Sequence, residues 1–233
     1  MRTIGLIGGM SWESTVPYYR QINEVVKQRL GGLHSARLVL YSVDFHDLER
    51  CMHNGDWQAA GALLALAARA LELAGAQCIV LCTNTLHKVA DAIAAAVRIP
   101  LLHIADATAR EIVSAGVSKV GLLGTRITME EPFYRERLSA RAALRVLVPE
   151  QADRELIQGV IFQELCLGKV LASSRVQLQR IIHSLVAQGA QAIVLGCTEL
   201  SMIIGPEDST VTVLDTTSIH AREAAAWALA AQR

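Results

Sequence analysis

Two short polar clusters, each at the end of an apolar run, carry residue types that can do chemistry. One stretch reads QCIVLCTNTLH at 77–87 and includes Cys82 and Thr83. The other reads AIVLGCTELS at 192–201 and includes Cys197. A thiol can move a proton near neutral pH when its surroundings, for example a helix N-terminus, lower its pKa. Both stretches are therefore candidate sites of acid–base chemistry.

The segments around these clusters alternate between short β-branched runs and long Ala- and Leu-rich runs. This alternation predicts an α/β fold with parallel sheets. In such sheets ligands bind outside the carboxyl ends of the strands, where both clusters are expected. The expected strands are 3–8, 36–43, 77–82, 100–104 and 119–125, and the expected helices are 15–30, 57–75, 85–97, 106–116 and 217–231.

An internal repeat divides the chain into similar halves. Three segments recur in the same order with offsets of 116, 114 and 112 residues: 4–11 with 120–127, 75–86 with 189–200, and 102–111 with 214–223. We expect two similar Rossmann-like parallel-sheet domains, related by a pseudo-twofold axis, with the active site in the cleft between them. The first would comprise 1–100 plus 216–233, and the second 101–215.

The repeat also separates the roles of Cys82 and Thr83. Under the offset of 114 residues, Thr83 is equivalent to Cys197, and Cys82 to Gly196. Side chains alternate along a strand, so neighbours at a strand end point in different directions. If Cys197 faces a site, Thr83 is its counterpart, and Cys82 should face the core.

The composition argues against several classes of function. Lys plus Arg equals Asp plus Glu at 22 each, which gives no reason to expect nucleic acid or an acidic membrane surface. No uninterrupted apolar stretch is long enough to span a membrane, and the N-terminus does not resemble a signal peptide. Five cysteines without a CxxC pair indicate a reduced, cytoplasmic protein. The scattered histidines make a metal site unexpected.

Taken together, the motifs resemble the aspartate/glutamate racemase family of cofactor-independent amino-acid racemases. The resemblance is carried by GLIGGMSWEST at 5–15, TNT at 83–85, LLGT at 122–125, GCTEL at 196–200 and DTTSIHA at 215–221. It implies a homodimeric isomerase that acts on a small amino acid and needs no pyridoxal phosphate or metal. It also implies two opposed catalytic groups, here Thr83 and Cys197.

The resemblance assigns binding roles to further residues. Asn84, Thr85 and Thr198 match positions that bind the carboxylate and amino groups of the substrate. Met10 and Ser11 match pocket-lining positions. The remaining matched positions are Thr125, in the equivalent loop of the second half, and Cys166 and Met52, where the family often carries a lysine and a polar or basic contact.

Three departures from the family pattern bear on activity. The usual CNT motif reads TNT, so the weakly acidic Thr83 replaces a catalytic cysteine. We expect a slow racemase that deprotonates one enantiomer more readily than the other. With Cys166 and Met52 at these positions an acidic substrate side chain loses its expected partners. We therefore expect aspartate and glutamate or a broader set of substrates, in which a smaller, neutral or less stringently chosen amino acid is included. The open alternatives are a one-cysteine decarboxylase or isomerase of a related acid, and a weakly catalytic amino-acid-binding protein.

Overall fold

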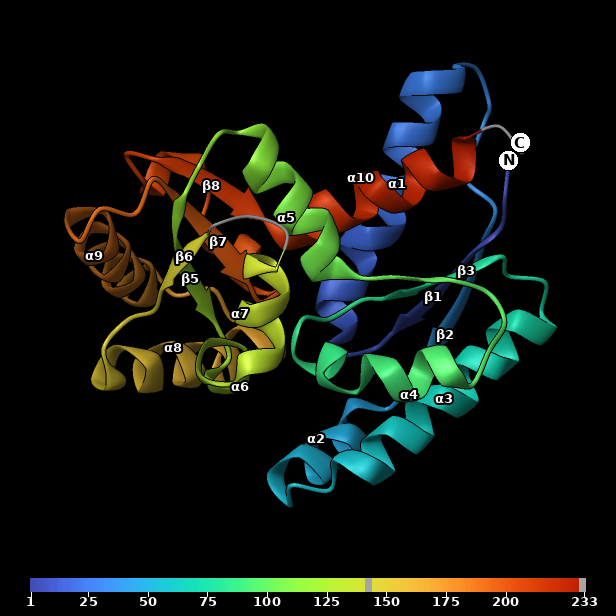
Figure 1. Cartoon of the computed structure of the whole chain (residues 1–233), viewed down its shortest axis with the longest axis horizontal. Coiled ribbons are helices and arrows are strands. Elements are labelled where there is room, and N and C mark those ends of the chain that lie inside the picture. The colour runs from blue at the N-terminus through green and yellow to red at the C-terminus, as the bar shows by residue number, and fades with distance from the viewer. Residues whose placement is uncertain (141–143, 231–233) are drawn as a thin grey trace. The chain divides into compact units, whose positions relative to one another are not determined.

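The computed structural model describes residues 1–140 and 144–230 of the chain (Figure 1). These residues form two compact units, 1–104 with the C-terminal segment from His220, and 105–219. Each unit contains one parallel four-stranded sheet, with strand order β2-β1-β3-β4 in the first and β6-β5-β7-β8 in the second. The expected α/β class with two similar parallel sheets is confirmed. As domains with the boundaries expected above, the halves stay a prediction.

In the first unit, strands alternate with helices as the sequence pattern predicts. The elements are β1 (Ile4–Gly8), α1 (Trp12–Leu30), β2 (Leu38–Ser42), α2 (Phe45–His53), α3 (Trp57–Leu73), β3 (Cys78–Leu81), the 3-10 helix η1 (Thr85–Val89), α4 (Ala90–Ala95) and β4 (Leu101–Leu102). The sequence pattern had not assigned α2. It is preceded by Asp44, whose side chain accepts a hydrogen bond from the His46 amide and so caps the helix.

The second unit repeats this order. Its elements are α5 (Ile104–Ser114), β5 (Lys119–Gly124), α6 (Arg126–Glu130), α7 (Pro132–Ser139), β6 (Arg145–Leu147), α8 (Gln151–Gln163), η2 (Leu165–Leu167), α9 (Ala172–Ala187), β7 (Ala192–Gly196), η3 (Leu200–Met202), η4 (Pro206–Asp208) and β8 (Thr212–Asp215). The chain then enters α10 (Thr216–Leu229). The first two pairs of repeated segments identified from sequence fall on β1 and β5 and on β3 and β7. The third pair begins at the ends of β4 and β8 and continues into α5 and α10.

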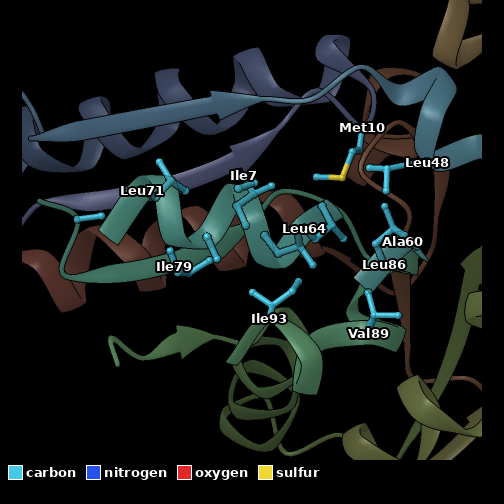
Figure 2. Packing of buried hydrophobic residues seen from close by; sticks show 14 residues of the cluster. Ile7, Met10, Leu48, Ala60, Leu64, Leu71, Ile79, Leu86, Val89 and Ile93 are labelled. Atoms are coloured by element: carbon cyan, nitrogen blue, oxygen red, sulfur yellow. The ribbon is translucent and has the colours of Figure 1, made fainter. Parts of the chain in front are cut away.

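Two apolar clusters cover the two faces of the first sheet. One packs Ile79 and Leu81 of β3 against α3 and α4, with Leu64 and Ile93 among the buried contacts (Figure 2). The other packs the alternate β3 residues against Tyr18 of α1 and the alanines of α10. Because adjacent side chains of a strand point to opposite faces, β3 supplies both clusters and is apolar throughout.

The helix that follows each fourth strand belongs to the other unit. Most of α5 lies in the second unit, although it follows β4 of the first. Most of α10 lies in the first unit, although it follows β8 of the second. In the first unit, Arg2 is tied to α10: its amide donates to the Ala228 carbonyl at 2.9 Å, and its guanidinium lies 4.6 Å from the centre of the Trp227 ring.

The expected helix at 85–97 forms instead as η1 followed by the short α4. The reason lies in the competition for one carbonyl group. In an α-helix the Thr83 carbonyl would accept from the His87 amide, but the His87 ring nitrogen Nδ1 occupies it at 2.7 Å. The His87 amide bonds the Asn84 carbonyl at 3.1 Å instead, which is the 3-10 pattern.

Candidate active site

The loop after β1 is held closed by one buried threonine. Gly9 has a φ of 92°, and a Cβ atom there would overlap the carbonyl oxygen of Val43, so the position requires glycine. The Oγ1 atom of Thr15 accepts a hydrogen bond from the Gly9 amide at 2.9 Å and donates one to the Ser11 carbonyl at 2.9 Å. These two bonds position Met10 and Ser11 at the carboxyl end of β1.

The two methionines predicted as pocket residues lie against the core. The Met10 side chain is 2% exposed and lies beside Leu48 in the cluster of Figure 2. Met52 of α2 is partly buried and packs against the same cluster. Both side chains thus contribute to packing, and a direct substrate contact through either of them stays a prediction.

Thr83 lies two residues after the end of β3 and begins a buried polar turn. Its amide bonds the Leu81 carbonyl at 2.9 Å, and its own carbonyl accepts from His87. The exposed fractions of Thr83, Asn84 and Thr85 are 7%, 2% and 7%. Since β1 and β3 are neighbours in the sheet, this turn and the loop after β1 lie at the same carboxyl edge.

Cys82 lies in the core, as the alternation argument predicts. It is fully buried, in the cluster that also contains Cys78, Val80 and Tyr18. Burial raises the pKa of the Cys82 thiol far above its ordinary value. A protonated thiol enclosed by apolar side chains is inert, so Cys82 is a packing residue.

Three buried histidine rings lie behind the turn. The ring centres of His87 and His103 are 4.3 Å apart, and those of His87 and His220 are 6.0 Å apart. A carbonyl oxygen can only accept, so His87 Nδ1 carries the proton that it donates to Thr83, and its Nε2 accepts from the Ile104 amide at 3.3 Å. His87 therefore fixes the backbone on both sides of the turn.

His220 is held in one tautomer within the first unit. Its Nε2 donates to the Leu102 carbonyl at 2.8 Å, so its Nδ1 accepts from the Tyr18 hydroxyl at 3.0 Å. Both ring nitrogens are thus occupied by groups of the first unit.

In the second unit, two glycines let the ends of β5 and β7 approach closely. Gly124 lies opposite Gly196 in the parallel register. A Cβ atom on Gly124 would lie 2.7 Å from the Gly196 carbonyl oxygen, and one on Gly196 would lie 3.0 Å from that of Leu123. Thr125 follows at once and caps α6, with its Oγ1 accepting from the Thr128 amide at 3.3 Å.

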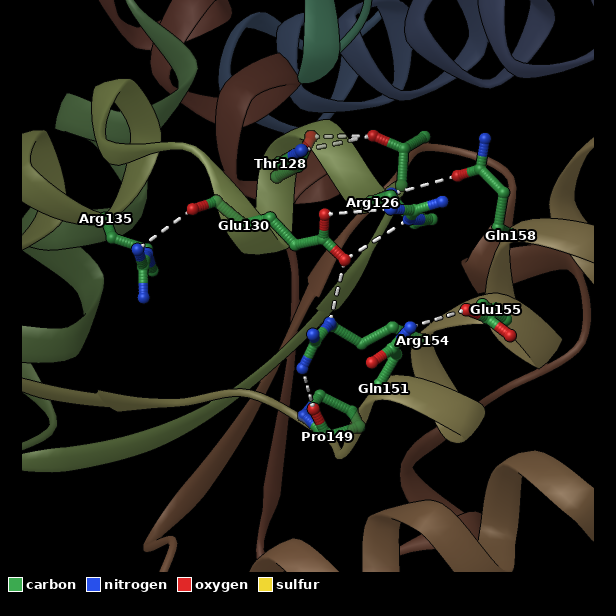
Figure 3. Close-up of polar contacts among 10 residues, drawn as sticks. Arg126, Thr128, Glu130, Arg135, Pro149, Gln151, Arg154, Glu155 and Gln158 are labelled. Carbon is green, nitrogen blue, oxygen red and sulfur yellow. Dashed lines mark hydrogen bonds and ion pairs between the residues drawn. The ribbon is translucent and has the colours of Figure 1, made fainter.

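An ion-pair network anchors α6 to α8 next to Thr125 (Figure 3). The Glu130 carboxylate accepts from Arg126 at 3.2 Å and from Arg154 of α8 at 2.9 Å. The hydrogen bond from Arg126 is the main cause that lowers the pKa of Glu130. The Arg126 amide donates to Gln158 Oε1 at 2.9 Å, so the first turn of α6 is also held by α8.

A thiol and a carboxylate share a hydrogen bond at the end of β7. Cys197 Sγ donates to Glu199 Oε2 at 3.1 Å, and Thr198 Oγ1 donates to the same oxygen at 2.8 Å. All three residues are buried, with exposed fractions of 6%, 3% and 3% for Cys197, Thr198 and Glu199. Burial first, and then the negative charge of Glu199, raise the pKa of the Cys197 thiol well above its ordinary value.

Cys166 lies close enough to this pair to interact with it electrostatically. It is part of the turn η2, between α8 and α9, and is partly buried. Burial, followed by the charge of Glu199, raises the pKa of Cys166 to about 12. Cys166 also contributes to the raised pKa of Cys197. The structure therefore brings Cys166 to the same end of the second unit as Cys197.

The predicted residues fall into one group in each unit. Those of the first unit follow β1 and β3 or lie on α2, and those of the second follow β5 and β7 or lie on η2. That the two groups face one substrate stays a prediction. Glu199 was missed from the sequence, although a carboxylate two positions after Cys197 in GCTEL was the available signal.

Within residues 1–140 and 144–230, no group of three or more His, Cys, Asp and Glu side chains is arranged to hold a metal ion. No helix in this described part of the chain has the length and apolar character needed to cross a membrane. All five cysteines are free thiols.

Comparisons with known proteins agree over almost the whole chain. A crystal structure from Yersinia pestis, provisionally assigned as an Asp/Glu racemase, is 55% identical and has a TM-score of 0.91, covering 99% of this chain and 100% of that one. An aspartate racemase homologue from Pyrococcus horikoshii OT3 is 35% identical with a TM-score of 0.84, covering 98% and 99%. The broad-specificity amino-acid racemase RacX of Bacillus subtilis (strain 168) is 23% identical over 98% of this chain and 99% of its own length.

The family model for Asp/Glu/Hydantoin racemases matches residues 7–224, which include every predicted site residue. Together with the relatives of 35% and 55% identity, this match shows the family membership that the motifs indicated only as a resemblance. The chain belongs to the Asp/Glu/Hydantoin racemase family.

Proposed function

We propose that this protein is an amino-acid racemase, an isomerase that inverts the α-carbon of a small amino acid by proton transfer. The family match and the names of its relatives support the reaction class. The observation that carries the proposal in this chain is Cys197, a buried thiol at a strand end, hydrogen-bonded to a carboxylate at 3.1 Å. The repeat offset assigns Thr83 to the equivalent strand end of the first unit.

In the proposed mechanism Cys197 serves one face of the α-carbon and Thr83 the other. One group removes the α-proton, and the opposite group returns a proton to the other face. Asn84, Thr85 and Thr198 bind the carboxylate and amino groups, and the loop of Met10 and Ser11 lines the pocket. Thr125, Met52 and Cys166 complete the set of proposed substrate contacts.

The threonine makes the proposed enzyme asymmetric. A hydroxyl is a far weaker acid than a thiol, so proton removal on the Thr83 side should be slower than on the Cys197 side. Cys82 does not replace it, because its thiol is enclosed in the core. The equilibrium constant between the free enantiomers stays near unity, so kcat/KM is equal for the L- and the D-enantiomer. The difference between the two directions therefore appears in kcat and in KM taken separately.

The substrate set is proposed to be aspartate and glutamate or a broader group of amino acids, without pyridoxal phosphate or a metal. The decisive test incubates the protein with a panel of L- and D-amino acids, including aspartate, glutamate and homoserine, without added cofactor. Chiral chromatography should show both enantiomers arising from either one. Binding without solvent exchange at the α-carbon, or carbon dioxide release from substituted malonates, would instead support the alternatives.

Exchange in deuterium oxide tests the two residues. We expect α-proton exchange to be faster from one enantiomer in the unmutated enzyme, and Cys197→Ser to abolish most of it. Thr83→Cys should raise the rate and reduce the difference between enantiomers. Equal exchange from both enantiomers in the unmutated enzyme would refute the asymmetry. Cys82→Ala is the matched control, because it removes a neighbouring thiol that points into the core.

We further propose that the enzyme is a cytoplasmic homodimer. The five free cysteines are consistent with a reducing compartment. Sedimentation equilibrium of the purified chain, with a monomer mass of 25.2 kDa, decides the oligomeric state, and a single species at that mass would exclude the dimer.

A further inference from the structure

The backbone of Thr83 is held at both of its polar groups. Its amide donates to the Leu81 carbonyl at 2.9 Å, which closes a tight turn directly after β3. Its carbonyl accepts from His87 Nδ1 at 2.7 Å. The first bond lies within the main chain, whereas the second is supplied by a single side chain. The direction of the peptide group between Thr83 and Asn84 therefore depends on the His87 ring.

The direction of this backbone decides where the Thr83 hydroxyl points. Threonine is branched at Cβ, so its side chain adopts few χ1 rotamers and follows the backbone to which it is attached. The Thr83 hydroxyl makes no hydrogen bond to another group among residues 1–140 and 144–230. Apart from the packing around a side chain that is 7% exposed, the backbone is therefore what restrains the hydroxyl.

The His87 ring is itself fixed by groups on its far side. Its Nε2 accepts at 3.3 Å from the amide of Ile104, which is the first residue of α5 and so cannot bond this amide within its own helix. The ring centre lies 4.3 Å from that of His103, and His87 is 3% exposed. Ile104 follows β4, whose last carbonyl, that of Leu102, accepts from His220 Nε2 at 2.8 Å. The His87 ring therefore cannot turn without breaking a bond at each nitrogen.

We propose that His87 is a positioning residue for proton transfer on the Thr83 side of the α-carbon. This role rests on the proposed racemase function. By holding the Thr83 carbonyl, the ring aims the hydroxyl at the face that Cys197 does not serve. A weakly acidic hydroxyl depends on its alignment, because a misplacement of about 1 Å can cost about 100-fold in rate. His87 exchanges no proton with the substrate and acts only through Thr83.

Two substitutions separate the roles of the two ring nitrogens. The side-chain amide of asparagine lies near the position of Nδ1, so His87→Asn can still donate to the Thr83 carbonyl while it loses the bond from Ile104. The longer glutamine reaches the position of Nε2, so His87→Gln can accept from the Ile104 amide while it releases the Thr83 carbonyl. Each variant keeps one of the two bonds, so we expect similar losses of stability from both.

The first assay follows each enantiomer in deuterium oxide and separates exchange from inversion. An enantiomer whose α-proton faces Cys197 can lose it and regain a deuteron from the same side, which does not need Thr83. Inversion needs the Thr83 side in either direction. We expect His87→Gln to lower inversion about 100-fold, while exchange from that enantiomer stays close to that of the unmutated enzyme. His87→Asn should retain most of the inversion.

The second assay does not depend on racemisation. Three-bond couplings from the Thr83 methyl carbon to its backbone nitrogen and carbonyl carbon report χ1 in solution NMR. The unmutated protein and His87→Asn should show one rotamer, and His87→Gln should show an average over several. If no amino acid is inverted but the couplings change in this way, the proposed function fails while the positioning of Thr83 by His87 stands.

Two controls complete the test. ¹⁵N spectra of the histidines in the unmutated protein should show the His87 proton on Nδ1, and a proton on Nε2 would overturn the proposed role even if neither variant folds. His183→Gln changes an exposed histidine of α9 and should alter neither assay. An equal loss of inversion and exchange in both His87 variants, with unchanged Thr83 couplings, would also overturn the role, because the ring would then contribute only to stability.

Discussion

Replacing Thr15 by valine tests how the loop after β1 is held. The substitution keeps the shape of the side chain and removes the Oγ1 atom that bonds the Gly9 amide and the Ser11 carbonyl, each at 2.9 Å. Ser11 O keeps the hydrogen bond from Ser14 at 3.1 Å, so the larger loss falls on the Gly9 amide. Leaving a buried donor unsatisfied costs about 1–3 kcal/mol, and the second bond adds about 0.5–1.5 kcal/mol.

We therefore expect Thr15→Val to lower the free energy of unfolding by about 1.5–4.5 kcal/mol. Urea unfolding followed by tryptophan fluorescence measures this change in the stability of the first unit. The three tryptophans, Trp12, Trp57 and Trp227, all lie in the first unit, so the signal reports the unit that carries the mutation. Under the proposed function, KM should rise as well, because the same bonds position Met10 and Ser11.

Thr15→Ser is the matched control for this prediction. It keeps the hydroxyl and loses one methyl group, so it should retain most of the stability and most of the substrate affinity. Equal destabilisation by serine and valine would show that the methyl contact matters more than the hydrogen bonds. A valine variant within about 0.5 kcal/mol of the unmutated protein, the range of neutral surface changes, would refute the reasoning outright.

Three other changes have definite expected outcomes. Gly9→Ala forces a side chain into a positive φ and against the Val43 carbonyl, and urea unfolding should show a loss of at least about 1–3 kcal/mol. Asp208→Asn weakens the two bonds from Arg175, at 2.8 and 2.9 Å, and thermal unfolding should show a loss of about 1.5–3 kcal/mol. Burial raises the pKa of Asp208, but the bonds led by Arg175 more than reverse this and lower it. The stabilisation is therefore present above the unfolded value near 3.9 and is lost as pH falls through the lower folded pKa, so the effect of Asp208→Asn should shrink in acid. Cys82→Ala should leave the racemisation rate within twofold in the chiral assay, and a larger loss would contradict its assignment to the core.

The fold was largely predictable because its signals are local. The apolar runs of β1, β3, β5 and β7 and their repeat offsets identify two parallel sheets without any knowledge of long-range contacts. The same alternation predicted that Cys82 faces the core, and the structure confirms it. These inferences depend only on the period of a strand, which the sequence shows directly.

Features that depend on which side-chain atom meets which partner were not predictable. The 3-10 turn after β3 forms because the His87 ring takes the Thr83 carbonyl, and helix propensity does not show which ring nitrogen finds which acceptor. His220 bonds the Leu102 carbonyl 118 residues away, a contact that no local pattern reveals. Glu199 was visible in GCTEL, but its meaning required the 3.1 Å approach to Cys197.

The exchange of α5 and α10 between the two units has a consequence for synthesis on the ribosome. Ile4, Leu6 and Tyr18 are translated long before α10, yet the cluster that buries them is completed by alanines 221, 224, 225 and 228 of that helix. Until α10 has been translated, the N-terminal half must keep this apolar surface uncovered or screened by a chaperone. Loss of α10 should therefore damage the packing around β1 and α1 before that of any other part of the protein.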